Sequence, residues 1–139
     1  MHVMLKYAAA AAAGAVAAGS IAYAQAASPP RAIVSIYHAA PGHQEMLLQW
    51  LAQQERVGAS VGLPASQIYA HTDGDSWDYL MIAPVTTEAQ DQAFDAAAAK
   101  MGVTSGPKAG LELRKHIQSH TDTFVVGPMT ASQMLDRLK

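Results

Sequence analysis

The chain has 139 residues, 50% of them hydrophobic, with a formal net charge of −2 and no cysteine. This length suits one domain with a real core, and the absence of a basic patch argues against a nucleic-acid-binding protein. Without cysteine the chain forms no disulfide and carries no lipid-modified cysteine, a composition compatible with an oxidising compartment.

The first residues are typical of a secretory signal peptide. Lys6 supplies a positive charge, a short alanine-rich run follows, and small residues allow cleavage after Ala24 or after Ala26. A membrane anchor fits less well, because a spanning helix needs about 20 strongly apolar residues. We therefore expect residues 1–26 to be removed and residues 27–139 to form one domain. The mature protein should be periplasmic or secreted and free of the membrane.

A strand and a long helix are expected at the start of the mature domain. Residues 31–38 concentrate β-branched and aromatic side chains, which favours a strand. After a turn at residues 40–43, apolar residues recur at helical spacing until Gly62. The expected buried stripe of this helix is Leu47, Trp50, Leu51, Gln54, Gly58 and Val61.

A hairpin and a second helix should follow. Residues 66–71 and 77–85 are predicted strands, joined by turn residues at 72–76. Thr87 and Gln90 form a T-x-x-Q capping box, and Gly102 closes the helix behind it. That helix is expected to bury Ala93, Phe94, Ala97, Ala98 and Met101.

The last part of the chain is predicted to contain a loop, a strand and a short helix. Residues 104–110 are assigned to a loop and residues 121–127 to a strand. A second T-x-x-Q box, Thr130 with Gln133, should start a terminal helix that carries Met134, Leu135 and Leu138.

This order of elements predicts an α+β fold, a ferredoxin-like β-α-β-β-α-β sheet with a C-terminal helix. We expect the first and third strands to be parallel neighbours in the middle of the sheet. Both faces of the sheet are apolar: Ile33 and Tyr37 lie on one face of the first strand, and Val34 and Ile36 lie on the other. Because helices can cover one face only, we predict a homodimer packed sheet to sheet.

The strand-helix-hairpin-helix-strand order with a two-faced sheet resembles the dimeric α/β-barrel superfamily. That group includes antibiotic-biosynthesis-type monooxygenases, EthD-like proteins and NIPSNAP-like proteins. The resemblance covers Arg31 to about Gly127 and depends on element order, because no motif of a catalytic set is present. It implies a small aromatic or haem-type ligand in the space between the sheet and the helices.

Histidines are the main candidates for chemistry. His38 ends the first strand and His120 begins the last, so in neighbouring strands the two should approach each other at one edge of the sheet. His43 and His116 are expected at the same rim, whereas His71 is expected at the opposite edge. Imidazoles gathered in this way could act as a base, a proton shuttle or a metal ligand.

His116 and His120 also have the spacing of two metal ligands on one helix face. If the stretch were helical, Asp122 or His38 could supply a third ligand for zinc or copper. The alternative is that both are exposed polar residues at a helix end, where histidine favours the helix dipole. We therefore assign no metal ligands, and the cofactor is unknown, with haem or a transition metal as candidates.

Aromatic side chains along the strands are the other candidates. Tyr37, Tyr69, Trp77 and Tyr79 could line one sheet face, either as core and dimer interface or as the wall of a pocket for a flat apolar ligand. The candidate catalytic residues are thus His38 and His120. The candidate ligand-binding residues are Tyr37, His43, His116 and Tyr79.

Two functions agree with these features. The first is an exported homodimer that binds a small apolar or aromatic ligand and could act as a monooxygenase-like enzyme. The second is a non-enzymatic periplasmic protein that binds a metal or haem.

Overall fold

The computed structural model describes residues 30–139. The predicted signal peptide, residues 1–26, lies outside the described residues. Within residues 30–139, none of the helices has both the length and the apolar character needed to cross a membrane.

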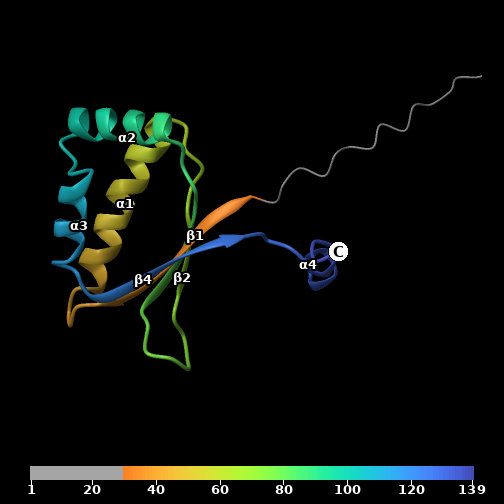
Figure 1. The fold of residues 1–139 in the computed structure, drawn as a ribbon. Coiled ribbons are helices and arrows are strands. Elements are labelled where there is room, and N and C mark those ends of the chain that lie inside the picture. The colour runs from red at the N-terminus through yellow and green to blue at the C-terminus, as the bar shows by residue number, and fades with distance from the viewer. Residues whose placement is uncertain (1–29) are drawn as a thin grey trace, which may run out of the picture.

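Four strands form one antiparallel sheet in the order β2-β3-β1-β4 (Figure 1). They are β1 (Arg31–Ala39), β2 (Gln67–Ala70), β3 (Tyr79–Pro84) and β4 (Ile117–Val126). This order, with helices between β1 and β2 and between β3 and β4, is the predicted ferredoxin-like α+β fold.

The predicted parallel pairing of the first and third strands is wrong. They are neighbours, but β1 and β3 run antiparallel, with Val34 opposite Ile82 and Tyr37 opposite Tyr79. The crossover helix leaves β2 parallel to β1, and the hairpin then reverses the chain, so β3 returns between them in the opposite direction. The C-terminal ends of β1 and β2 therefore lie at the same end of the sheet, together with the N-terminal end of β3.

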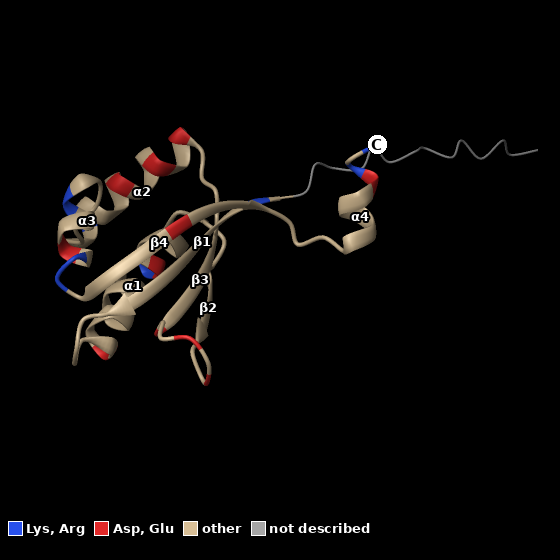
Figure 2. Cartoon of the chain, turned by 60° about the horizontal axis from the view of Figure 1, so that its bottom comes forward, with Lys and Arg blue, Asp and Glu red and all other residues tan. Residues whose placement is uncertain are grey.

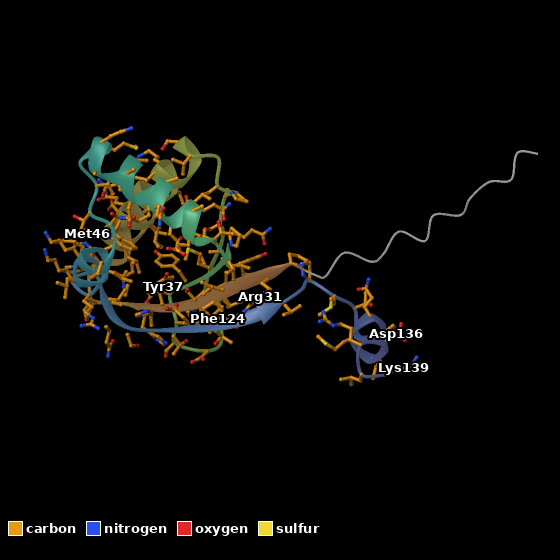
Figure 3. The ribbon with its side chains drawn as sticks, turned by 45° about the horizontal axis from the view of Figure 1, so that its top comes forward. Arg31, Tyr37, Met46, Phe124, Asp136 and Lys139 are labelled. Atoms are coloured by element: carbon orange, nitrogen blue, oxygen red, sulfur yellow. The ribbon has the colours of Figure 1, made fainter. Side chains whose placement is uncertain are left out.

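Three helices cover one face of the sheet: α1 (Gln44–Ser60), α2 (Glu88–Met101) and α3 (Pro107–Leu113) (Figure 1). The predicted capping box of α2 is present in full, with Thr87 and Gln90 bonded reciprocally. Gly102 ends α2 in the left-handed conformation, at φ 67°. The fourth helix, α4 (Ala131–Asp136), has the same kind of box and stands apart from the rest of the fold (Figure 3).

The stretch between α2 and the last strand differs from the prediction. Residues assigned to a loop form α3, which begins with Pro107 at a position where proline costs no hydrogen bond. The last strand starts at Ile117 instead of residue 121. Five β-branched residues and Phe124 favour the extended chain there. The strand pairs with β1 from Ile117 to Val126.

The two faces of the sheet are divided as the alternation predicts. Ile33 and Tyr37 point to the helices, whereas Val34, Ile36 and their β3 partners Ile82 and Leu80 form the opposite, open face. Figure 2 shows few charges on the sheet: β2 and β3 carry no Lys, Arg, Asp or Glu. The open face is therefore an apolar surface that no element of the described chain covers.

The interior consists of two clusters. One lies between β1, α1, α3 and the start of β4, and it contains Tyr37, Ala39, Leu47, Leu51, Leu113 and Ile117. The other joins α1 to α2 through Val57, Ala98 and Val103, with Phe94 and Ala97 beside them. Ala93 and Met101 of α2, which were expected to be buried, are exposed, because α2 packs on α1 through a narrow stripe.

Candidate ligand-binding cavity

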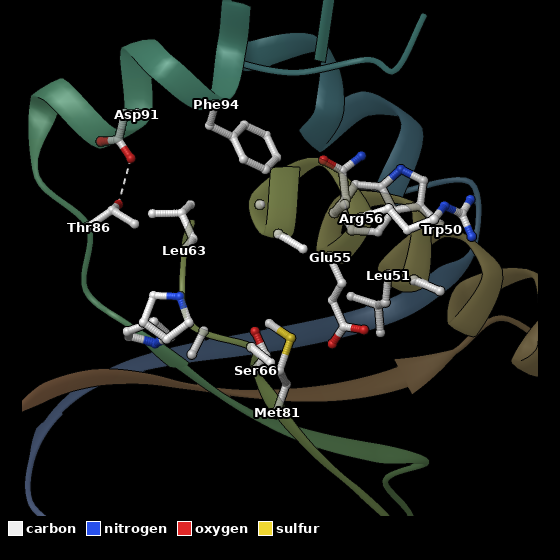
Figure 4. A pocket seen from close by; sticks show the side chains of 18 of the residues that line it. Trp50, Leu51, Glu55, Arg56, Leu63, Ser66, Met81, Thr86, Asp91 and Phe94 are labelled. Atoms are coloured by element: carbon white, nitrogen blue, oxygen red, sulfur yellow. Dashed lines mark hydrogen bonds between the residues drawn. The ribbon is translucent and has the colours of Figure 1, made fainter. Parts of the chain in front are cut away.

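A cavity of about 710 Å³ lies between the helix-facing side of the sheet and helices α1 and α2. Its size is within the range of small-molecule sites, about 300 to 1,000 Å³. Its lining includes Tyr37 and Leu51 of the first core cluster, and Phe94, which packs against the second. The main apolar side chains around it are Tyr37, Trp50, Leu51, Leu63, Met81 and Phe94 (Figure 4).

Local sequence explains why this space is open. On the sheet side, Ala83 follows Met81 on the same face of β3, and its small side chain leaves space between this part of the sheet and the helices. On the helix side, Gly58 of α1 has no side chain, and the nearest neighbours of a Cβ there would be Leu63 and Phe94. Gly58 thus lets α1 approach Phe94 of α2 closely, and Ala83 leaves space above the sheet.

Polar groups lie at the rim of the cavity. Glu55 and Arg56 of α1 border it. The Thr86 hydroxyl donates to Asp91 Oδ1 at 2.5 Å, which ties the segment between β3 and α2 to the first turn of α2 (Figure 4). An apolar interior with a few polar groups at its border is typical of a site for a small, mostly apolar ligand.

Tyr37 connects the cavity to a polar group beneath it. It is 4% exposed, lines the cavity, and lies between sheet and helices in Figure 3. Its ring stacks on His120 of β4, with centroids 5.9 Å apart and an interplanar angle of 14°. Beside them, Ser35 donates a hydrogen bond of 2.7 Å to Asp122.

Tyr37 has an altered acidity. Burial raises the pKa of its hydroxyl, hydrogen bonding to Ser35 partly offsets the rise, and the Asp122 carboxylate adds to it. Tyr37 is therefore a neutral hydrogen-bond donor at physiological pH. Burial and the Asp78 carboxylate likewise raise the pKa of Tyr79, which lies opposite Tyr37 on β3.

Two of the predicted rim histidines meet. His43 precedes α1 and His116 precedes β4, and their rings lie 5.8 Å apart. A backbone bond of 2.9 Å from Ala40 to the His116 carbonyl holds the two turns together. Both Nδ1 atoms are buried without a hydrogen-bond partner. His116 also borders a second hollow of about 560 Å³ beside α1 and α3.

His38 and His120 lie close along the strands but do not face each other. Opposite residues of an antiparallel pair share a face, and His120 is opposite Tyr37 while His38 is opposite Ser119. His120 therefore points to the helix side and His38 to the open face. The expectation that the two would approach each other at one site fails because their register differs by one residue.

The expected position of His71 is also wrong. Because β2 is parallel to β1, His71 lies at the same end of the sheet as His38, on the β2 side. Its ring packs edge-on against Trp77 at 5.1 Å. Asp78 ties this end of the sheet together, since its carbonyl accepts from His71 N and its Oδ2 accepts from Ala39 N at 2.7 Å.

The four strand aromatics do not share one face. Tyr37 and Tyr79 lie opposite each other on the helix side, whereas Tyr69 is opposite Leu80 on the open face and is 51% exposed. Trp77 lies outside the strands, in the turn before β3. Of these residues, Tyr37 alone lines the large cavity.

The helical spacing of His116 and His120 has no structural meaning, because the first lies in a turn and the second in β4. Within residues 30–139 no group of three or more His, Cys, Asp or Glu side chains is arranged to hold a metal ion.

Ser35 is the residue that the sequence prediction missed. It is a polar side chain, 3% exposed, in the strand face that also carries Ile33 and Tyr37. A serine within an otherwise apolar buried face was the available signal, because buried hydroxyls need a hydrogen-bond partner. The cavity walls from α1, α2 and the residues between α1 and β2 gave no comparable signal in the sequence.

No family model matches the chain, and none of the curated proteins compared matches it in sequence. Among solved structures, SnoaB, a cofactor-independent oxygenase from Streptomyces nogalater, has 20% identity and a TM-score of 0.46, over 74% of this chain and 97% of that chain. A dimeric ferredoxin-like protein of unknown function from Thermobifida fusca has 10% identity and a TM-score of 0.47, over 73% and 93%.

An uncharacterized NIPSNAP domain protein from Burkholderia xenovorans has 11% identity and a TM-score of 0.45, over 73% of this chain and 97% of that chain. The ferredoxin-like fold predicted from element order is confirmed by the order of strands and helices in the structure itself. At these identities the likeness concerns the fold alone, since one fold hosts many activities.

Proposed function

We propose that this chain is an exported homodimer that binds a small apolar or aromatic ligand in the cavity between the sheet and helices α1 and α2. The cavity carries the proposal: about 710 Å³ of space with an apolar interior and a polar rim, open to a ligand. Its position agrees with the space that the fold resemblance implied. Tyr37 supplies the neutral hydroxyl that would orient a polar atom of the ligand.

A dye titration tests this site. The fluorescence of 8-anilinonaphthalene sulfonate should rise on addition of residues 27–139, because the dye becomes fluorescent in apolar surroundings. Ala83→Phe places a ring on the cavity floor, and we expect it to weaken dye binding about tenfold or more by filling the space. Ala96→Phe, on the exposed side of α2, is the matched control and should bind as the wild type does. Equal binding by the two variants would exclude the cavity.

A monooxygenase-like activity is the finer form of this proposal. The support for it is the apolar cavity together with Tyr37 and His120, a buried phenol ring stacked on an imidazole. Oxygen consumption with aromatic compounds that displace the dye is the measurement, and loss of that activity in His120→Ala is the expected result. The alternative function is a non-enzymatic periplasmic protein that binds a metal or haem, and an absorbance titration of residues 27–139 with haemin, together with metal analysis of the purified protein, tests it.

Export is part of the proposal and has its own test. Residues 1–26 have the charge, apolar run and small residues of a signal peptide. Expressed in a bacterium, the chain should be recovered from the periplasm with Gln25 or Ala27 as its first residue. Recovery of the uncleaved chain from the cytoplasm would contradict export.

A further inference from the structure

Two histidines lie against each other outside the ligand cavity. His43 comes directly before α1 and His116 directly before β4, and their ring centroids lie 5.8 Å apart at an interplanar angle of 43°. Ala40 N donates to the His116 carbonyl at 2.9 Å, and His43 N donates to the Ala40 carbonyl at 2.8 Å. These backbone bonds connect the two turns and set the distance between the imidazoles.

Each of the two rings has a nitrogen atom without a hydrogen-bond partner. The Nδ1 atoms of His43 and His116 are both buried, and neither is bonded to a protein group. A buried polar atom without a partner is costly, so two of them in adjacent rings indicate a shared partner. When the proton of an imidazole is on Nε2, its Nδ1 carries the lone pair that a metal ion binds.

A thioether lies beside the pair of histidines. Met46 is three residues after His43, so the two side chains are neighbours at the start of α1. Met46 and His116 line the same hollow of about 560 Å³ beside α1 and α3, and Met46 is 39% exposed. Met46 is thus a neighbour of His43 along the helix and of His116 across the hollow.

These three side chains are the donors that copper(I) prefers. Thioethers select copper(I), and imidazole binds copper as well as zinc. Within residues 30–139, no further His, Cys, Asp or Glu joins the pair to make a group of three, so a four-ligand zinc site is not formed there. Rings with centroids 5.8 Å apart can share one ion, because two metal–nitrogen bonds of about 2.0 Å span most of that distance.

The charges around the hollow also favour a singly charged ion. Arg56 and Glu112 line it, and Lys115 is paired with Glu112 at 2.8 Å. The ion pair competes with any use of Glu112 as a metal ligand. Two basic groups beside one acidic group repel a divalent cation more strongly than a monovalent one, since the Coulomb energy scales with charge.

We propose that His43, His116 and Met46 form a copper(I) site, with the two Nδ1 atoms and the methionine sulfur as ligands. None of the three lines the cavity of about 710 Å³, so this inference does not depend on ligand binding there. It gives the metal-binding alternative a particular metal and particular residues. Leu47, one turn after His43, and Ile117, next to His116, belong to the core and provide an apolar surrounding.

Competition with bicinchoninate, whose copper(I) complex is coloured, measures the affinity of the site. Residues 27–139, purified without a histidine tag and kept with ascorbate in the absence of oxygen, should withdraw one copper(I) ion per chain from this complex. His43→Gln and His116→Gln should each weaken copper(I) binding about 100-fold or more, and Met46→Leu about tenfold.

X-ray absorption identifies the ligands directly. The spectrum of bound copper(I) should show sulfur and nitrogen neighbours in the wild type, and nitrogen without sulfur in Met46→Leu. Because Met46 is partly exposed, this substitution leaves the core intact, and its spectrum reports on the ligand set independently of folding.

Matched variants separate the site from general effects. The Nε2 atom of His71 is likewise buried without a partner, but the ring next to it is that of Trp77 and not an imidazole. Met101 is an exposed methionine at the end of α2. His71→Gln and Met101→Leu should bind copper(I) as the wild type does. His43→Gln and His116→Gln should still bind the fluorescent dye, which shows that they fold.

The outcomes distinguish this site from the ligand cavity. If the dye binds but copper(I) does not, the metal site is wrong and the ligand-binding function stands. Copper(I) binding by His43→Gln or Met46→Leu as tight as that of the wild type would overturn the ligand set, and tighter binding of Zn²⁺ would overturn the choice of metal. If copper(I) binds and the dye does not, the cavity proposal alone fails.

Discussion

Gly58 lies in the last turn of α1, where that helix faces α2. A methyl group at this position would lie 3.6 Å from Leu63 Cβ and 4.0 Å from a ring carbon of Phe94, which are ordinary contacts. Alanine is favoured over glycine inside a helix by about 1 kcal/mol. We expect Gly58→Ala to raise the free energy of unfolding by about 1 kcal/mol in urea denaturation.

Two other glycines provide the controls for this prediction. In α3, a Cβ at Gly110 would meet nothing within 4 Å, so Gly110→Ala tests helix propensity without new contacts. Gly102 has φ 67°, and alanine there should destabilise the protein. A loss of stability in Gly58→Ala would show that α1 and α2 pack too closely to admit the methyl group.

Tyr37 couples stability to alkaline pH. Burial raises the pKa of its hydroxyl above the ordinary value of 10.0, so the folded protein holds this proton more tightly than the unfolded chain does. The stabilisation is complete below about pH 10 and is lost as pH rises through the raised pKa. Wild type should therefore lose more unfolding free energy than Tyr37→Phe between about pH 9 and pH 11. Identical pH profiles would contradict this coupling.

At the residue scale, strand alternation correctly predicted which sheet face a side chain lies on, but it did not predict which side chains of neighbouring strands contact each other. It placed Tyr37 on one face and Ile36 on the other, as the pairing of β1 with β3 confirms. The pairing of His38 with His120 failed, because proximity in register does not give a common face when the offset is one residue. Ser35 was overlooked because its partner Asp122 lies 87 residues away in the chain.

At the scale of helices, α2 and α4 begin with the same capping box, so the same mutation can be compared in two settings. The side chain of Thr87 accepts from Gln90 N, and that of Thr130 accepts from Gln133 N. Loss of a threonine cap costs about 1 kcal/mol where the helix is packed. Since α2 contributes Ala98 to the core, Thr87→Ala should lower the unfolding free energy by about this amount in urea denaturation.

Thr130→Ala should leave the global unfolding free energy unchanged, because α4 has no buried residue. Its effect should be limited to a small loss of helical circular dichroism. A destabilisation equal to that of Thr87→Ala would mean that α4 packs on another surface in the assembled protein.

The two capping boxes were the most reliable sequence signals, because each depends only on hydrogen bonds between residues three positions apart in the chain. The boundary between α3 and β4 was not predictable in the same way. Residues 104–110 carry glycine and proline, which indicate a loop, yet Pro107 serves as the first residue of a helix whose Leu113 enters the core. The early start of β4 depends on pairing with β1, a contact between distant parts of the chain.

At the scale of the whole molecule, element order was sufficient to predict the α+β fold, because few topologies accommodate this order. The direction of β3 was missed, although the hairpin alone requires it to oppose β2. The cavity could not be located from the sequence, because it is the space that remains between the sheet and the two helices when α2 packs on α1 through a few residues around Ala98. A space of this kind depends on helix placement that no local pattern encodes.

The open face of the sheet leads to the last prediction, that two copies associate through it. Val34, Ile36, Leu80 and Ile82 form its centre, and no charge interrupts them. Burying a charge there without a partner costs several kcal/mol, so Ile36→Glu should convert the dimer to a monomer in sedimentation velocity. Leu111→Glu, at an exposed position of α3 on the helix side, should remain dimeric. A wild-type chain that sediments as a monomer, or a dimer that Ile36→Glu leaves intact, would show that this face is not the interface.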